Sequence, residues 1–242
     1  MMDKHFMPAS VASVPRKTAE PATLFSGPVA DDYPLSHARS LDRLTTMERS
    51  YGWVHIDNPV IQNEATVRFH GAGLSATGVQ HGEGYQATWA LEATENWATQ
   101  NVTVNVEGDG WERSLKLVRS EQGVWSSQTK EEGTPPTNLP SPGIVRSADL
   151  EDALDCDLGL CPLTNTMPIR RLGLLEAQVP KTQLIMAWID MPSLEVIASD
   201  QYYSSIDSKT VRYASGTRGV DVELEVDSDG VVVHYPDLAQ RV

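Results

Sequence analysis

The chain has 242 residues, of which 40% are hydrophobic and 21% are charged, and its formal net charge is −14 at pH 7. The length and the hydrophobic content suit one large domain or two small ones with a sizeable core. Nucleic acids and anionic membranes bind clustered Lys and Arg side chains, so the acidic balance argues against both as partners.

The N-terminal segment, residues 1–47, is rich in Pro, Ala and Ser and lacks a sustained apolar period, which predicts a mobile tail. A short helix is the alternative at its end, where Leu41, Leu44 and Met47 recur at spacing three. The segment has no run of about seven apolar residues, so we predict no secretory signal and expect a cytoplasmic protein. No window of the chain approaches the roughly 18 apolar residues of a membrane-spanning helix, and we expect no integral membrane segment.

From Trp53 onward, apolar and polar residues alternate with period two in many short segments. Glycine-containing turns such as EGDG and DSDG separate several of them. Only the segment 148–155, ADLEDALD, favours a short helix in this region. We therefore predict a mainly β fold, an antiparallel sheet that curls into a barrel or a roll, with few short helices. The alternating segments are 66–71, 85–93, 99–110, 113–120, 183–191, 209–215 and 220–235.

The segment 126–148 contains four prolines and few apolar groups. Proline lacks a backbone N–H donor, so these residues predict a long surface loop without ladder strands. The loop divides an N-terminal group of strands from a C-terminal group. We expect both groups to form a single β-roll domain at 48–242.

Residues 155–172 read DCDLGLCPLTNTMPIRRL and concentrate charge on both sides of a turn. In an extended segment, Asp155 and Asp157 point to the same face. We predict that Arg170 and Arg171 lie on the strand that follows the turn and point to opposite faces. One of them is then expected to return to an aspartate, because a guanidinium matches a carboxylate in bidentate geometry.

This stretch supports two interpretations. It is either an internal ion-pair cluster that fixes a turn and a strand register, or a polar rim that contacts an anionic or hydroxylated head group. Structural ion-pair networks are common, which favours the first interpretation on chemistry alone. The second assigns head-group binding to Asp155, Asp157, Asn165, Arg170, Arg171 and Gln201.

Other site chemistry has little support in the sequence. Cys156 and Cys161 supply half of a zinc site and have no histidine nearby, so we expect no metal, no cofactor and no cysteine nucleophile. Acid–base catalysis by Asp155 and Asp157 stays as an alternative, although a carboxylate beside arginine remains ionised and makes a poor general acid. We assign no catalytic residue.

Aromatic residues are further candidates for a binding site, because the chain holds six Trp and only three Phe. A Trp ring offers a flat apolar face with one polar group, which suits a cavity lined for lipid or sugar. Filling of a β core is the alternative for each ring. The candidates for an apolar and aromatic lining are Trp97, Trp125, Trp188 and Tyr203.

The segment from Asp155 to Leu172, with its Thr-Asn-Thr-x-Pro-Ile-Arg-Arg core, resembles the signature of the bacterial putative glycolipid-binding family. Later pieces match in order, from Trp188 through Gln201-x-Tyr203 to the closing hairpin that ends at Tyr235. Upstream pieces that match the family are Trp97, Leu115, Leu117, Gly123 and Trp125.

The resemblance implies a spiral β-roll with an apolar interior and a glycolipid or another amphipathic small molecule as the ligand. Our leading hypothesis is a non-enzymatic binding protein with an apolar groove and a polar Asp/Asn/Arg mouth. The alternatives are a hydrolase that acts on a sugar or lipid ester through Asp155 and Asp157, and an interaction scaffold that uses strand edges and the tail. Whether the chain forms a homodimer is left open.

Overall fold

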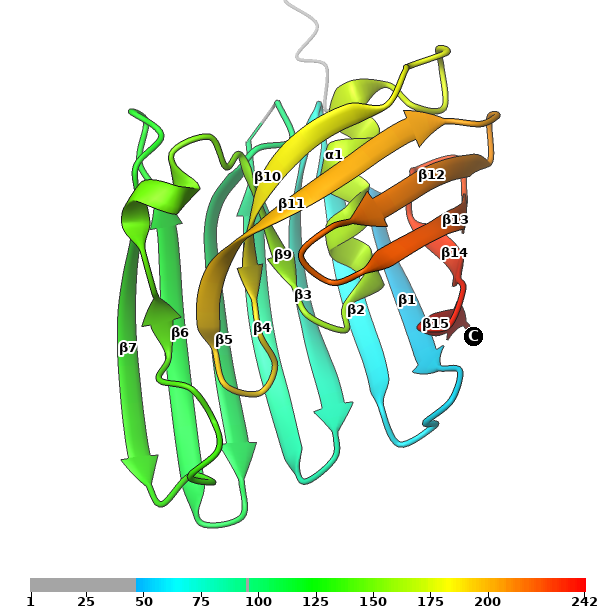
Figure 1. Cartoon of the computed structure of the whole chain (residues 1–242). Coiled ribbons are helices and arrows are strands. Elements are labelled where there is room, and N and C mark those ends of the chain that lie inside the picture. Colours follow the sequence, from blue (N-terminus) through cyan, green and yellow to red (C-terminus); the bar gives the residue numbers. More distant parts are fainter. Residues whose placement is uncertain (1–46, 95) are drawn as a thin grey trace, which may run out of the picture. The chain divides into compact units, whose positions relative to one another are not determined.

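The structure, a computed structural model, describes residues 47–94 and 96–242 (Figure 1). In this part of the chain, all strands belong to one sheet of fifteen, accompanied by one short α-helix and two 3-10 helices. The expected mainly β fold is confirmed. No helix among these residues is long and apolar enough to cross a membrane. The predicted tail and its alternative helix lie, apart from the last residue, Met47, outside the described residues.

The first seven strands form an antiparallel meander in which each strand pairs with the next in the sequence. They are β1 Met47–His55, β2 Gln62–His70, β3 Gly73–Gly82, β4 Tyr85–Ala93, β5 Thr99–Gly108, β6 Trp111–Arg119 and β7 Trp125–Gly133.

The C-terminal strands continue the same sheet from the other side of β1, which pairs with β15. The order then runs back through β14, β13, β12, β11 and β10 to β9, and only β9 and β8 pair in parallel. Figure 1 shows β9, β10, β11 and α1 in front of the first strands, so the sheet folds back over its own face. The remaining elements are β8 Gly143–Ile144, η1 Ser147–Leu150, β9 Asp155–Leu158, η2 Pro162–Asn165, α1 Thr166–Leu172, β10 Thr182–Ile189, β11 Glu195–Ser205, β12 Thr210–Ser215, β13 Val220–Val226, β14 Val232–Tyr235 and β15 Ala239–Arg241.

The core lies between the meander and the strands that cover it. On β2, Ala65 and Val67 are buried while Glu64 is exposed, as period-two alternation predicts. One apolar cluster joins such inward residues of the meander to Leu158 of β9. A second cluster packs Ile169 of α1 against the C-terminal strands. Burial of both clusters drives the fold-back of the sheet.

The prediction of a loop throughout 126–148 is wrong for its first part. Strand β7 pairs along its length with β6 and ends at Gly133. The four prolines all follow Gly133, so every strand residue keeps its backbone donor. Because β7 is an edge strand with mostly exposed side chains, its sequence lacks the apolar alternation that reveals the inner strands. The loop itself is confined to 134–142, before β8.

The prediction of a helix at 148–155 is also wrong in extent. Only Ser147–Leu150 form a turn of 3-10 helix, and Asp155 begins β9. Asp155 is aligned in parallel with Met186 of β10, and β9 is buried along its whole length. Pairing in the sheet therefore overrides the weak helical preference of this segment.

The strand predicted for Arg170 and Arg171 is replaced by the helix α1. Pro168 stands in its first turn, where backbone N–H groups have no partner within the helix, so the proline is tolerated. Gly173 ends the helix in the left-handed region, with φ of 64°. A helix of seven residues spans too few turns to show an apolar period in the sequence.

We predict that Trp53 ties the meander to the C-terminal strands. Its indole N–H donates a buried hydrogen bond of 2.8 Å to the carbonyl of Val232. Trp53→Phe leaves that carbonyl without this donor and is expected to lower the free energy of unfolding by about 1–3 kcal/mol beyond the loss of packing.

Trp89→Phe is the matched control, because the Trp89 indole N–H is buried and has no hydrogen-bond partner among the described residues. Denaturant unfolding of both variants measures how far each substitution lowers the free energy of unfolding. An equal loss for Trp53→Phe and Trp89→Phe would contradict the assignment.

Candidate functional site

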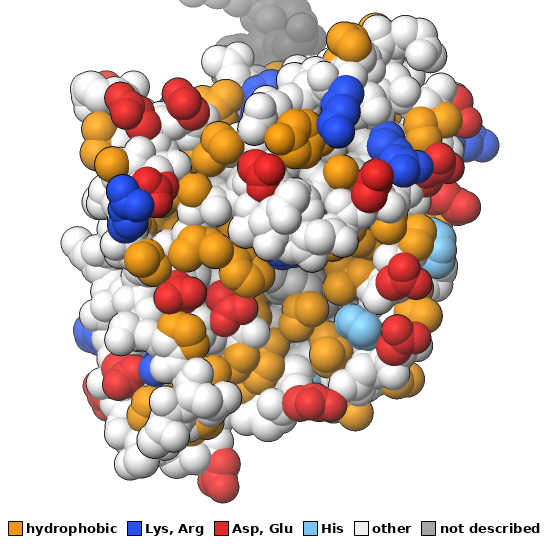
Figure 2. Space-filling model, viewed as in Figure 1, with side chains coloured by type: hydrophobic (Ala, Val, Ile, Leu, Met, Phe, Trp, Pro, Cys, Tyr) orange, Lys and Arg blue, Asp and Glu red, His pale blue; other side chains and the backbone are white. Residues whose placement is uncertain are grey.

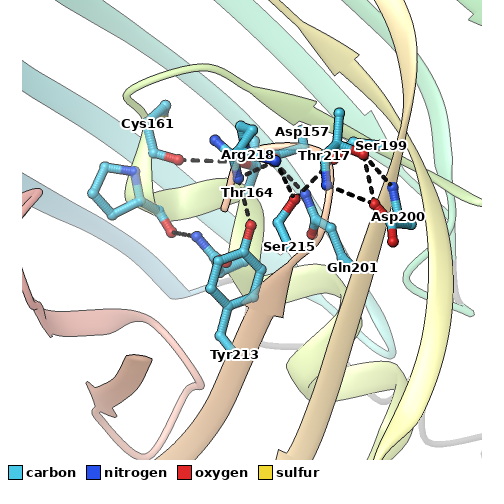
Figure 3. A network of polar contacts seen from close by, with 12 residues as sticks. Asp157, Cys161, Thr164, Ser199, Asp200, Gln201, Tyr213, Ser215, Thr217 and Arg218 are labelled. Carbon is cyan, nitrogen blue, oxygen red and sulfur yellow. Dashed lines mark hydrogen bonds and ion pairs between the residues drawn. The ribbon is translucent and has the colours of Figure 1, made fainter. Parts of the chain in front are cut away.

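A buried carboxylate, that of Asp157 on β9, is the centre of a polar network (Figure 3). Thr164 donates to Asp157 Oδ1 at 2.8 Å, and Gln201 donates to Oδ2 at 2.6 Å. Arg218 donates to the same Oδ2 at 3.2 Å. The donors come from η2, β11 and the β12–β13 turn, so the network joins three separate segments to β9.

Two tyrosines complete the network. The Tyr203 hydroxyl lies 2.9 Å from Asn165 Oδ1 and 3.1 Å from Gln201 Oε1 and donates its proton to one of them. The Tyr213 hydroxyl accepts a hydrogen bond from Arg218. Burial raises the pKa of Tyr213 to about 12 and also raises that of Tyr203 well above its usual value, so both hydroxyls stay protonated at neutral pH.

Arg218 is held in place by the turn that carries it. The neighbouring Thr217 donates its backbone N–H and its hydroxyl to Asp200 Oδ1, at 2.8 and 2.5 Å. These hydrogen bonds lower the pKa of Asp200. Sequence reasoning missed Arg218, because a single arginine in an SGTRG turn carries no pattern that distinguishes it from a solvated surface charge.

A second buried carboxylate, Asp155, forms the ion pair expected from the sequence. Arg171 donates to its two oxygens at 2.6 and 2.5 Å in bidentate geometry. Burial raises the pKa of Asp155, and the hydrogen bonds and charge of Arg171 oppose that shift. Arg170 turns away, pairs with Glu176 at 3.2 Å and lies over the ring of Trp97. The two arginines thus diverge, but on a helix.

A pocket of about 510 Å³ adjoins the network. Arg218 belongs to both, since its Nη2 binds Asp157 while the residue lines the pocket. The guanidinium lies over the ring of Trp188 at 5.6 Å from the centroid. The lining residues come from the β9–η2 turn, the end of β10, the β12–β13 hairpin and the β14–β15 turn: Gly159, Leu160, Trp188, Asp190, Met191, Arg218, Gly219, Val220, Asp221, Val222, Tyr235, Pro236, Asp237 and Leu238.

The β9–η2 turn, one wall of the pocket, is held by side chains from the meander. Gln80 donates to the carbonyl of Gly159 at 3.0 Å, and Asn63 donates to that of Leu160 at 2.8 Å. Tyr85 in turn donates to Gln80 Oε1 at 2.8 Å. Leu160 has a positive φ of 62°, a strained conformation for a leucine that these contacts stabilise.

The residues predicted for head-group binding do not share one location. Four of them, Asp155, Asp157, Asn165 and Gln201, are buried together, each at most 8% exposed. Arg171 is bound to Asp155, and Arg170 lies nearer the surface, with its side chain 29% exposed. The network is therefore an interior structure, and Arg218 connects it to the pocket.

The residues predicted for the aromatic lining also separate. Trp188 lines the pocket, and Tyr203 belongs to the network. Trp97 is buried beside Phe69 in the core, and Trp125 donates its indole N–H to the carbonyl of Ala153 at 2.9 Å. A sequence distinguishes these two uses of Trp poorly, since both need an apolar strand position.

We predict that Arg171→Met lowers the free energy of unfolding by about 3–5 kcal/mol at neutral pH, because Asp155 becomes a buried charge without a partner. Loss of Arg171 raises the Asp155 pKa further, and a protonated carboxyl needs no cation. The deficit relative to the parent therefore grows as pH rises from the Asp155 pKa of the folded parent towards the higher Asp155 pKa of the folded variant, and is smallest below both.

Arg170→Met is the neighbouring control, and its loss is expected to be about 1 kcal/mol or less, because the pair with Glu176 is partly exposed. Denaturant unfolding of both variants at several pH values measures these differences. A deficit in Arg171→Met that is independent of pH would argue against an ionised Asp155 in the parent.

Comparisons with known proteins show the family of the chain. The sequence profile described as "Putative glycolipid-binding" matches residues 52–241. The crystal structure of a DUF1089 family protein from Pseudomonas aeruginosa is similar, with a TM-score of 0.58 and 25% identity, over 74% of this chain and 92% of that one. No curated protein matches the sequence. Since the profile spans the whole sheet except its first strand residues, the chain belongs to the putative glycolipid-binding family.

Proposed function

We propose that the protein binds a glycolipid or a similar amphipathic molecule, without chemistry, in the pocket beside Arg218. The observation that carries this is the joint composition of the lining. Leu160, Met191 and Val222 form apolar wall, while Arg218 and Asp190 place polar groups at the same cavity. A volume of about 510 Å³ lies in the range of small-molecule sites.

Apolar contact would supply most of the affinity, at about 25 cal/mol per Å² removed from water. Val220 and Val222 sit on the inward face of β13 with Leu224, yet they are only partly buried. Both valines also line the pocket. An acyl chain against these valines would continue the apolar cluster of the C-terminal strands.

The polar network supports the same proposal by fixing Arg218. Arg218 is held by Asp157 and Tyr213, so its position is set before a ligand arrives. A donor that is already oriented binds with less loss of conformational entropy. In this proposal Asp157 acts on the ligand through Arg218 and not by direct contact.

The hydrolase alternative receives less support. Asp155 and Asp157 are buried and paired with Arg171 and Arg218, and a carboxylate held in an ion pair is a poor proton donor. Burial raises the pKa of Cys161 to about 12, so its thiolate form is scarce at neutral pH. The scaffold alternative relies on strand edges and on the tail, and the tail lies, apart from Met47, outside the described residues.

We predict that Asp157→Asn acts on stability. The amide cannot balance the charge of Arg218, and one of its oxygen acceptors is lost, so the free energy of unfolding is expected to fall by about 1–3 kcal/mol. The hydrolase alternative expects loss of turnover of a sugar or lipid ester at unchanged melting temperature. Thermal unfolding and an esterase assay on the same preparation separate the two.

A second prediction concerns the apolar wall. Val222→Glu puts a charge among the pocket valines and is expected to abolish glycolipid uptake, measured by native mass spectrometry after mixing purified protein with a monoglycosyl diacylglycerol. Val124→Glu, at a valine that is 63% exposed and outside the pocket, is the control and keeps uptake.

Circular dichroism checks that both variants fold. Should Val222→Glu fail to fold, Val222→Thr keeps the shape of the side chain and is expected to weaken uptake in the same direction. Uptake that is equal in Val222→Thr and the parent, or absent from the parent, would refute the proposed site.

A further inference from the structure

The polar part of the pocket lining carries more acid than base. Asp190, Asp221 and Asp237 line it, and Arg218 is the basic residue among the lining residues. On the face that Figure 2 shows, hydrophobic side chains gather in the central and lower part with acidic ones among and beside them, while most Lys and Arg lie higher. Among the ionisable side chains that line the cavity itself, acids therefore outnumber bases.

The ion pairs of the lining residues leave more unpaired acid than unpaired base in the pocket. The charge of Arg218 is already balanced by Asp157, and Asp221 pairs with Arg212 at 2.7 Å. Asp190 accepts a hydrogen bond from the Ser193 hydroxyl. Neither Asp190 nor Asp237 forms an ion pair within the described ranges. The field inside the pocket is therefore negative, although a guanidinium stands in its wall.

An anionic head group meets like charge in such a pocket. A phosphate, sulfate or carboxylate placed near Asp190 and Asp237 is repelled, and Arg218 has little free charge to offset the repulsion. Hydroxyl groups behave differently, because each one donates a proton that a carboxylate accepts. The partly buried ring of Trp188 adds flat apolar surface, against which the C–H face of a sugar can pack.

Building on the proposed function, we infer that the pocket selects an uncharged, hydroxyl-rich head group, such as a neutral hexose, and rejects anionic head groups. Asp190 and Asp237 act as acceptors for sugar hydroxyls and as the charge that excludes anions. Specificity of this kind comes from repulsion of the wrong ligand as well as from contacts to the right one.

The test holds the alkyl chain constant and changes the head. Full-length protein is titrated by calorimetry with octyl β-glucoside, octyl sulfate and octylamine, each below its micelle concentration. We expect octyl β-glucoside to bind at least about tenfold more tightly than octyl sulfate, and octylamine, whose charge this field attracts, to bind more tightly than octyl sulfate as well.

The double variant Asp190→Asn/Asp237→Asn removes both unpaired charges. Asn tolerates the positive φ of 61° at position 237, so the backbone is kept. In this variant we expect the ratio of the affinity for octyl β-glucoside to the affinity for octyl sulfate to fall at least about threefold, because the two charges no longer repel the sulfate. Asp109→Asn, at an exposed hairpin turn outside the pocket, leaves the preference unchanged.

The titrations distinguish a failure of the head-group assignment from a failure of the proposed function. Binding of octyl sulfate as tight as or tighter than that of octyl β-glucoside or octylamine, or a preference that the double variant leaves intact, overturns the head-group assignment while amphiphile binding stands. If none of the three compounds binds, the proposed function itself fails.

Discussion

The carboxylate of Asp157 sets the arrangement around the site. A buried charge is costly unless donors surround it, and its three donors belong to η2, β11 and the β12–β13 turn. These segments must therefore meet at β9 in one arrangement. That meeting also places Arg218 at the pocket, so the polar interior and the candidate binding surface share one side chain.

The pocket differs in construction from the core beneath it. The core forms by alternation within long strands, whereas the pocket lies where four chain reversals converge. Polar side chains hold these reversals: Gln80 and Asn63 bind the turn at Gly159–Leu160, and Asp200 binds the turn before Arg218. Because loops carry the contacts to ligand, their composition can change with little effect on the sheet. In the proposed function, acidic residues at this place would tune selectivity at little cost in stability.

Particular residues show how far the sequence could be interpreted. The pairing of an aspartate with one of two adjacent arginines was predicted from bidentate chemistry, and Arg171 with Asp155 confirms it. The predicted local structure, a strand that carries the two arginines, was wrong. Thr164, Asn165 and Pro168 favour turns as strongly as they favour a short capped helix. The edge strand β7 was missed for a related reason, since exposed polar residues on an edge carry no periodic signal. In each case a nonlocal contact decided among local alternatives of similar energy.

By itself, the sequence determined the β class, most strand positions and the family, because period-two burial and a fixed local motif are written along the chain. It also placed Asp157, Gln201 and Trp188 among the residues of interest. Only the tertiary structure decided which of these residues belong to the buried network and which line the pocket. Arg218 is 61 residues from Asp157, and the walls of the pocket come from chain reversals far apart in the sequence. Such contacts depend on how a long sheet folds back on itself, which is set by the summed burial of two apolar clusters and by no local pattern.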